Sequence, residues 1–162
     1  PVTAKHSKLQ HWFVKVMGLF VEYHGLGDVF GPEMQMRTPG VRRQPDVCFV
    51  AKERLNIVKR TRIEGAPDLV VEIVSPDSVE RDWREKYHEY ETNGVREYWI
   101  VDMDYQRLRA YHLGADGRYA VIEESEGKTA SRVLPGFWLR AADLWQEPLP
   151  STLLALKELQ VI

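Results

Sequence analysis

Two acidic residues stand in segments whose other residues are typical of buried β-strands. Asp46 follows Pro45 at the start of segment 45–50, and Glu72 stands within the apolar segment 69–74. Both segments are short, rich in β-branched and aromatic residues, and bounded by proline or turn residues, which predicts strands. The residues around Glu72 are apolar on both alternating faces, as in a central strand covered on both sides. A carboxylate there must be protonated, paired with a cationic side chain or bound to a metal ion, because an unpaired buried charge is costly.

The positions of the two acids along their strands favour a metal site. Side chains alternate between the faces of a strand, so Glu72 shares a face with Asp68 and Val74, and Asp46 shares one with Cys48. If the two strands are neighbours, Asp46 and Glu72 converge near one end of the sheet. Paired carboxylates that hold Mg²⁺ with several waters are common in phosphate chemistry, since the ion acidifies a bound water and stabilises charge on the phosphate.

The helix expected next, over residues 78–92, offers a cation for such a site. Its apolar stripe consists of three aromatic residues at helical spacing, Trp83, Tyr87 and Tyr90. Lys86 lies at the border of this stripe and can lean toward the sheet. Asp82 lies four residues before Lys86 on the same helix face, either as its orienting partner or as an ordinary surface charge.

Each candidate also has an ordinary structural interpretation. Asp46 can be a solvated strand-start carboxylate after a proline. Glu72 can form a structural ion pair with a neighbouring Arg or Lys. Lys86 can form an exposed salt bridge with Asp82, worth only a few tenths of a kcal/mol. Asp68 either supports the site or simply begins its strand.

The order of predicted elements indicates a mixed α/β or α+β protein with helices on both faces of a central sheet. A first helix is expected over residues 7–23, with an apolar stripe of seven residues: Leu9, Trp12, Phe13, Val16, Leu19, Phe20 and Tyr23. Strands are expected at 28–30, 33–37, 45–50, 69–74 and 95–102, and a hairpin at 108–113 and 118–123. The charged segment 52–62 predicts a loop with a helical turn, segment 75–78 a turn, 134–139 a short apolar segment, and 151–160 an amphipathic helix.

Composition restricts the classes of function. The 162 residues predict one domain, and a formal net charge of −2 gives no global basic footprint. Binding to nucleic acid would need a local patch, for which basic residues flank the 45–50 strand: Arg42, Arg43, Lys52, Arg60 and Arg62. The single Cys48 predicts a buried thiol, and the five histidines lack metal-ligand spacing. No signal peptide or membrane span is visible, which predicts a cytoplasmic protein.

Three pieces of the sequence occur in an order that resembles one protein family. These pieces are segment 67–76 (PDLVVEIVSP), then Asp82, Lys86 and Tyr90, then segment 94–102 (GVREYWIVD). Together they resemble the Uma two family of restriction endonucleases, within the PD-(D/E)XK, restriction-endonuclease-like superfamily. The resemblance runs from about His6 through segment 134–136.

The resemblance implies a restriction-endonuclease-like core, here with an added C-terminal hairpin and helix, and a site that holds Mg²⁺ or Mn²⁺. The superfamily's first acid falls on Asp46 and its second on Glu72. The usual lysine two residues after the second acid is replaced by Val74, and its role is implied for Lys86 on the following helix. An acid on the first helix sometimes joins such sites, and Glu22 is the candidate.

Three hypotheses follow. The first is a metal-dependent nuclease acting on nucleic acid, with DNA as the expected substrate. The second is a catalytically silent module for nucleic-acid or protein binding, with Glu72 held in a structural ion pair by Lys86. The third, compatible with either, is a homodimer formed through the apolar segments 134–139 and 149–159. Family members usually carry a segment before the first helix, so the start at Pro1 predicts a trimmed N-terminus or lost edge strands.

Overall fold

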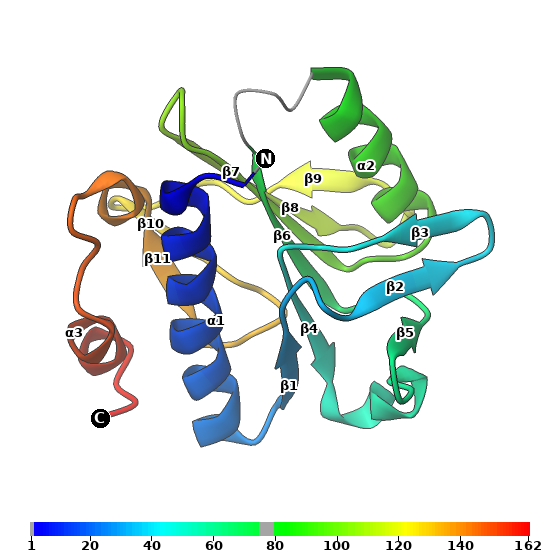
Figure 1. Cartoon of the computed structure of the whole chain (residues 1–162), viewed down its shortest axis with the longest axis horizontal. Helices are drawn as coiled ribbons and strands as arrows, with labels where there is room; N and C mark the ends of the chain where they lie inside the picture. The colour runs from blue at the N-terminus through cyan, green and yellow to red at the C-terminus, as the bar shows by residue number, and fades with distance from the viewer. Residues whose placement is uncertain (1, 75–79) are drawn as a thin grey trace.

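The computed structural model describes residues 2–74 and 80–162, and the side chains of residues 80–82 lie outside this description. Over these residues a six-stranded mixed sheet forms the centre of the fold (Figure 1). Its strands, in spatial order, are β1 (Gly27–Phe30), β4 (Val47–Ala51), β6 (Leu69–Val74), β7 (Glu97–Asp102), β8 (Arg107–Leu113) and β9 (Tyr119–Val121). Strands β6 and β7 are parallel, and the other neighbours are antiparallel.

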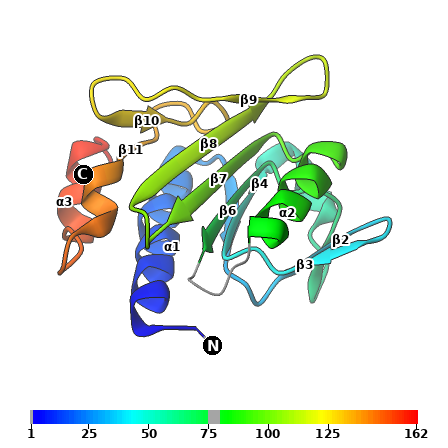
Figure 2. The same ribbon diagram turned by 90° about the horizontal axis from the view of Figure 1, so that it is seen from above.

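The two longer helices cover opposite faces of this sheet, as Figure 2 shows. Helix α1 (Ala4–His24) begins after Thr3, whose side chain accepts a hydrogen bond from the His6 N–H, and ends at Gly25 in the left-handed conformation. Helix α2 (Glu80–Thr92) carries the predicted aromatic stripe. The mixed α/β prediction is thus confirmed.

Within α1 the predicted apolar stripe needs one correction. Leu19 and Tyr23 are exposed, whereas Met17 and Val21 are buried in their place. Helical periodicity defines the direction of the buried face but not its width, and here the sheet and the C-terminal elements cover the Met17 side.

Strand β6 separates two hydrophobic clusters, as expected for a central strand. Val71 and Ile73 pack into the cluster under α1, and Val70 packs into the cluster under α2. Because side chains alternate along the strand, Glu72 projects to the α2 side together with Val70. The orientation of Glu72 therefore follows from the parity of the strand.

The lone thiol, on neighbouring strand β4, is expected to be unreactive in the native protein. Cys48 is fully buried, and burial raises its pKa to about 12, whereas thiol reagents attack the thiolate. Native protein should therefore leave a thiol reagent unconsumed at about pH 8. The same protein in denaturant should consume one equivalent for its one cysteine. Fast labelling of the native protein would contradict the buried position of β4.

A smaller sheet that was not predicted as a unit lies beside the central one. It contains β3 (Val41–Arg43), β2 (Gln35–Thr38) and β5 (Arg62–Glu64) in that order. The segment 52–62, predicted as a loop with a helical turn, contains the 3₁₀ helix η1 (Lys52–Ile57), and β5 begins at its last residue. Strands β3 and β5 have three residues each and are mostly charged, so neither shows the alternation that identifies a strand.

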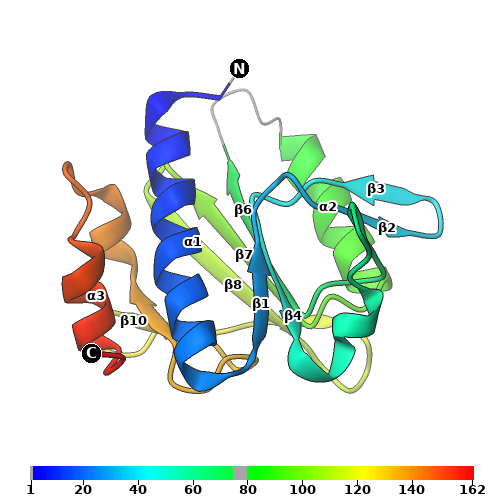
Figure 3. The same cartoon turned by 60° about the horizontal axis from the view of Figure 1, so that its bottom comes forward.

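The C-terminal part lies along the outer side of α1, as Figure 3 shows. It consists of β10 (Lys128–Ala130), β11 (Trp138–Arg140), the 3₁₀ helix η2 (Ala141–Trp145) and α3 (Thr152–Glu158). Only the last of these was predicted as such, and it packs against α1. Among the described residues, no helix is both long and apolar enough to span a lipid bilayer.

Candidate active site

The two acidic residues meet at one end of the central sheet. Strand β4 runs antiparallel to β6 with Val47 opposite Val71, so one further residue along this register brings Asp46 opposite Glu72. The Asp46 N–H donates to Glu72 Oε1 at 3.1 Å, and the Ile73 N–H donates to Asp46 Oδ2 at 2.8 Å. Asp46 thus lies immediately before β4, and its side chain continues the hydrogen bonding between β4 and β6. The convergence expected from the sequence is present.

Lys86 reaches the buried acid from α2. Its Nζ lies 2.5 Å from Glu72 Oε2, and the Glu72 side chain is 4% exposed against 23% for Lys86. Helix α2 packs on the face to which Glu72 projects, while Val74 occupies the position two residues further along β6. The cation required by the buried carboxylate therefore comes from the helix rather than from the strand.

Burial dominates the electrostatics of this cluster. It raises the pKa of Glu72 to about 7, with the Asp46 carboxylate adding to the increase and the Lys86 ammonium opposing it. In the absence of metal, Glu72 thus holds a proton for much of the time near neutrality. A divalent cation can replace this proton, because its two positive charges neutralise the carboxylates of Glu72 and Asp46 together.

The donor atoms suit an ion that keeps much of its water shell. Each carboxylate oxygen that already accepts a hydrogen bond has a further lone pair. Within the described part of the chain, no group of three or more His, Cys, Asp or Glu side chains is arranged to hold a metal ion. Two carboxylates completed by waters fit Mg²⁺, which is commonly bound in this way, or the similar Mn²⁺.

Two residues of α1 hold Asp46 in place, and both were missed by sequence reasoning. His6 Nε2 lies 3.3 Å from Asp46 Oδ1, and Gln10 Nε2 donates to the Asp46 main-chain oxygen at 2.9 Å. The hydrogen bond to Asp46 raises the pKa of His6, which is buried. The available signal was the spacing of His6 and Gln10, which lie four residues apart and hence on one face of the helix.

Comparisons with known proteins identify the family and the fold of this chain. A family model described as "Putative restriction endonuclease", Uma2, matches residues 1–142. The chain belongs to the Uma2 family. Among curated proteins none matches it. The chain is also similar to the crystal structure of "a putative nuclease belonging to DUF820" from Anabaena variabilis ATCC 29413, with 22% identity and a TM-score of 0.73. That match covers 88% of this chain and 81% of the other, and it shows that the Uma2 chain has the restriction-endonuclease-like fold.

The three predicted supporting residues of this Uma2 chain have different positions. Glu22 is exposed near the far end of α1, sixteen residues or about 24 Å along the helix from His6, so the structure does not bring it to the site. Asp68 lies immediately before β6, about 13 Å along the chain from Glu72. The Asp82 side chain and the turn predicted at 75–78 lie outside the described residues.

Asp68 has a structural environment of its own. It is fully buried, its Oδ2 accepts from the Ala51 N–H at 2.7 Å, and Arg54 Nη1 lies 3.0 Å from the same oxygen. Arg96 Nη1 lies 3.5 Å from Oδ1. These contacts tie β6 to the end of β4 and to η1. These contacts favour the ordinary structural role of Asp68, one of the two roles that the sequence left open.

The basic residues predicted to bind nucleic acid divide into two groups. Arg43 forms a two-pronged pair with Glu89 at 2.7 and 3.0 Å, and Arg62 pairs with Glu64. The remaining three are exposed and, over the described residues, form no ion pair: Arg42, Lys52 and Arg60. The basic surface of this Uma2 chain is therefore smaller than its sequence indicates.

Proposed function

We propose that this chain is a divalent-metal-dependent nuclease that hydrolyses phosphodiester bonds of nucleic acid, with DNA as the expected substrate. In this proposal residues 1–162 act as one restriction-endonuclease-like domain. The observation that carries it is the convergence of Asp46, Glu72 and Lys86 from three separate elements at one end of the sheet. Membership of the Uma2 family supports the same reaction class.

Each residue of the cluster would have a separate role in the reaction. Asp46 and Glu72 would hold Mg²⁺ or Mn²⁺, which when bound acidifies a water and stabilises charge on the phosphate. Lys86, which lies against Glu72 Oε2, can donate a hydrogen bond to the attacking water and offset charge on the scissile phosphodiester. His6 and Gln10 fix Asp46 at its side-chain and main-chain oxygens.

One observation favours a second candidate, the catalytically silent module. The direct contact with Lys86 already gives the buried Glu72 a cationic partner without metal. In that case the same cluster is a structural ion pair, and the protein binds nucleic acid or protein without cleaving it. The two candidates differ in whether Mn²⁺ binds.

The proposed function is tested by cleavage of single- and double-stranded DNA and of RNA with Mg²⁺ or Mn²⁺, against the same reactions in EDTA. We expect metal-dependent cleavage, and we expect Asp46→Asn to reduce it by more than about hundredfold, since even loss of an outer partner of a metal ligand costs up to that factor. Glu22→Gln is the matched control, because Glu22 is exposed at the far end of α1 and should leave cleavage unchanged. No cleavage of any substrate, together with no Mn²⁺ binding by calorimetry, would favour the silent module.

His6 is expected to act as a positioning residue for the metal ligand Asp46. His6→Gln should weaken Mn²⁺ binding by about 10–100-fold, the usual cost of losing an outer-shell partner. The measurement is calorimetric titration with Mn²⁺ at fixed pH. His11→Gln is the control, because His11 is exposed on the same helix. Equal affinities for the two variants would show that His6 does not position Asp46.

A further inference from the structure

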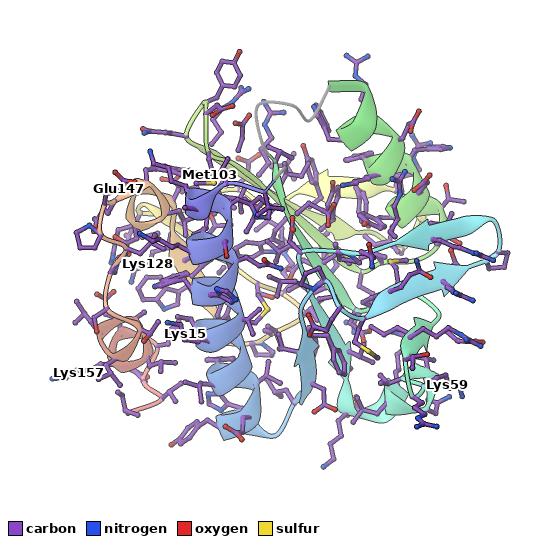
Figure 4. All side chains as sticks on the ribbon, viewed as in Figure 1. Lys15, Lys59, Met103, Lys128, Glu147 and Lys157 are labelled. Atoms are coloured by element: carbon purple, nitrogen blue, oxygen red, sulfur yellow. The ribbon has the colours of Figure 1, made fainter. Side chains whose placement is uncertain are left out.

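A cleft of about 960 Å³ lies between the N-terminal half of α1 and segment 144–152, which leads into α3. Residues from both walls are labelled in Figure 4: Lys15 on α1, Met103 after β7, and Glu147 in the C-terminal segment. The family match ends at residue 142, so the outer wall is formed by residues beyond the matched part of the chain.

The cleft borders the candidate active site through two shared residues. His6 lines it, and the Nε2 of the same ring lies 3.3 Å from Asp46 Oδ1. Val74 also lines it, two residues after Glu72 on β6. A molecule that fills the cleft therefore lies against the His6 ring, one residue away from Asp46.

One wall of the cleft is cationic. Lys5, Lys8 and Lys15 follow one face of α1, because spacings of three, seven and ten residues return to the same side of a helix. Lys5 pairs with Glu147 at 3.4 Å, but both side chains are about 70% exposed, so the pair contributes little. Lys8 and Lys15 are exposed, and no carboxylate of the described chain pairs with them. Besides Glu147, Asp104 is the other acid in the lining.

The opposite wall is largely apolar and fixed in position. Trp145, Leu149 and Met103 line it and are partly exposed. Trp12 anchors this wall to α1, since its indole N–H donates to the Pro150 main-chain oxygen at 2.9 Å. The cleft thus lies between folded elements, with lysines on the α1 wall and apolar side chains on the opposite wall.

We propose that this cleft binds a single-stranded segment of the nucleic-acid substrate, the part that flanks the scissile phosphate. Lys8 and Lys15 would contact successive phosphates, while Trp145 and its apolar neighbours contact the bases, the combination typical of single-strand sites. The ligand class rests on the proposed nuclease function. The volume, similar to that of a small-molecule site, admits a few nucleotides but not a duplex.

The test measures binding alone, without metal and without cleavage. A fluorescein-labelled single-stranded oligothymidylate is titrated with the whole protein in EDTA at several salt concentrations. The double variant Lys8→Gln/Lys15→Gln should bind about tenfold or more weakly at low salt. The slope of log affinity against log salt should become shallower by about 0.7 for each lysine removed. Trp145→Ala should weaken binding without changing that slope.

The matched control is Lys157→Gln, which removes one exposed positive charge from α3, outside the cleft (Figure 4). It should bind like the wild type. Unchanged affinity and salt slope in the double variant would overturn the inference, as would equal competition by an unlabelled duplex or no binding of the oligothymidylate at all. Lysine-dependent binding by a protein that neither cleaves nor binds Mn²⁺ would uphold the cleft and refute the proposed nuclease function instead.

Discussion

Lys86→Met is expected to reduce cleavage by about 10²–10³-fold while leaving the substrate KM nearly unchanged. Methionine keeps most of the length of the side chain but removes the ammonium that lies 2.5 Å from Glu72 Oε2. A preorganised charge of this kind acts on the transition state, and loss of one such contact usually has an effect of this size. Single-turnover cleavage with Mn²⁺ is the measurement.

The same variant should also change metal binding in a way that an ordinary surface pair would not. Lys86 holds the pKa of Glu72 down against burial, so its removal should raise that pKa further and move the onset of Mn²⁺ binding to higher pH. Lys157→Met on α3 serves as the control and should affect neither quantity. Wild-type cleavage and an unshifted Mn²⁺ onset in Lys86→Met would exclude Lys86 from the reaction.

Glu72→Gln should abolish both Mn²⁺ binding and cleavage. It should also remove a pH dependence from the stability of the metal-free protein. Burial raises the pKa of Glu72 from 4.5 to about 7, so the folded state favours the protonated form. That contribution to stability is fully present below the unfolded pKa of 4.5 and is lost as the pH rises through about 7. Metal-free wild type should therefore lose stability relative to Glu72→Gln between about pH 5 and about pH 8.

The measurement is urea unfolding of both proteins in EDTA across this pH range. His6 contributes a decline of the same sign, because its pKa is raised mainly by the hydrogen bond to Asp46. Most of this decline remains in the variant, since the Glu72 charge is the smallest of its causes. Added Mn²⁺ should stabilise the wild type more strongly as the pH rises, and it should have no effect on Glu72→Gln. A difference between the two proteins that does not change with pH would contradict the raised pKa.

Most of the fold was predictable because its main elements are long or fully apolar. The strand at 69–74 and the first helix follow from periodicity alone, and the structure has them as β6 and α1. Strands β3, β5 and β10 have three residues each, and their pairing is decided by neighbours distant in sequence. Short charged strands of this kind have no local pattern from which they could be inferred.

The site was predictable to the extent that it depends on strand parity and helix phase. Strand parity predicts that Asp46 and Glu72 converge, and helix phase predicts that Lys86 extends from α2 toward Glu72. They do not say which end of α1 lies next to Asp46. The sequence therefore offered Glu22, near the C-terminal end of α1, as a supporting acid, whereas His6, near the N-terminal end, is the residue in contact with Asp46. The direction of packing between distant elements is a tertiary property that the local sequence does not encode.

The most direct measurement is a crystal soaked in Mn²⁺, with the ion located by its anomalous scattering. We expect one ion bound by a carboxylate oxygen of Asp46 and one of Glu72, with waters completing its octahedral shell at about 2.1–2.2 Å. The Lys86 ammonium should remain within hydrogen-bond distance of one of those waters. No ion between the two acids, with Lys86 still paired to Glu72 as in the metal-free protein, would contradict the proposed metal site and favour the silent module.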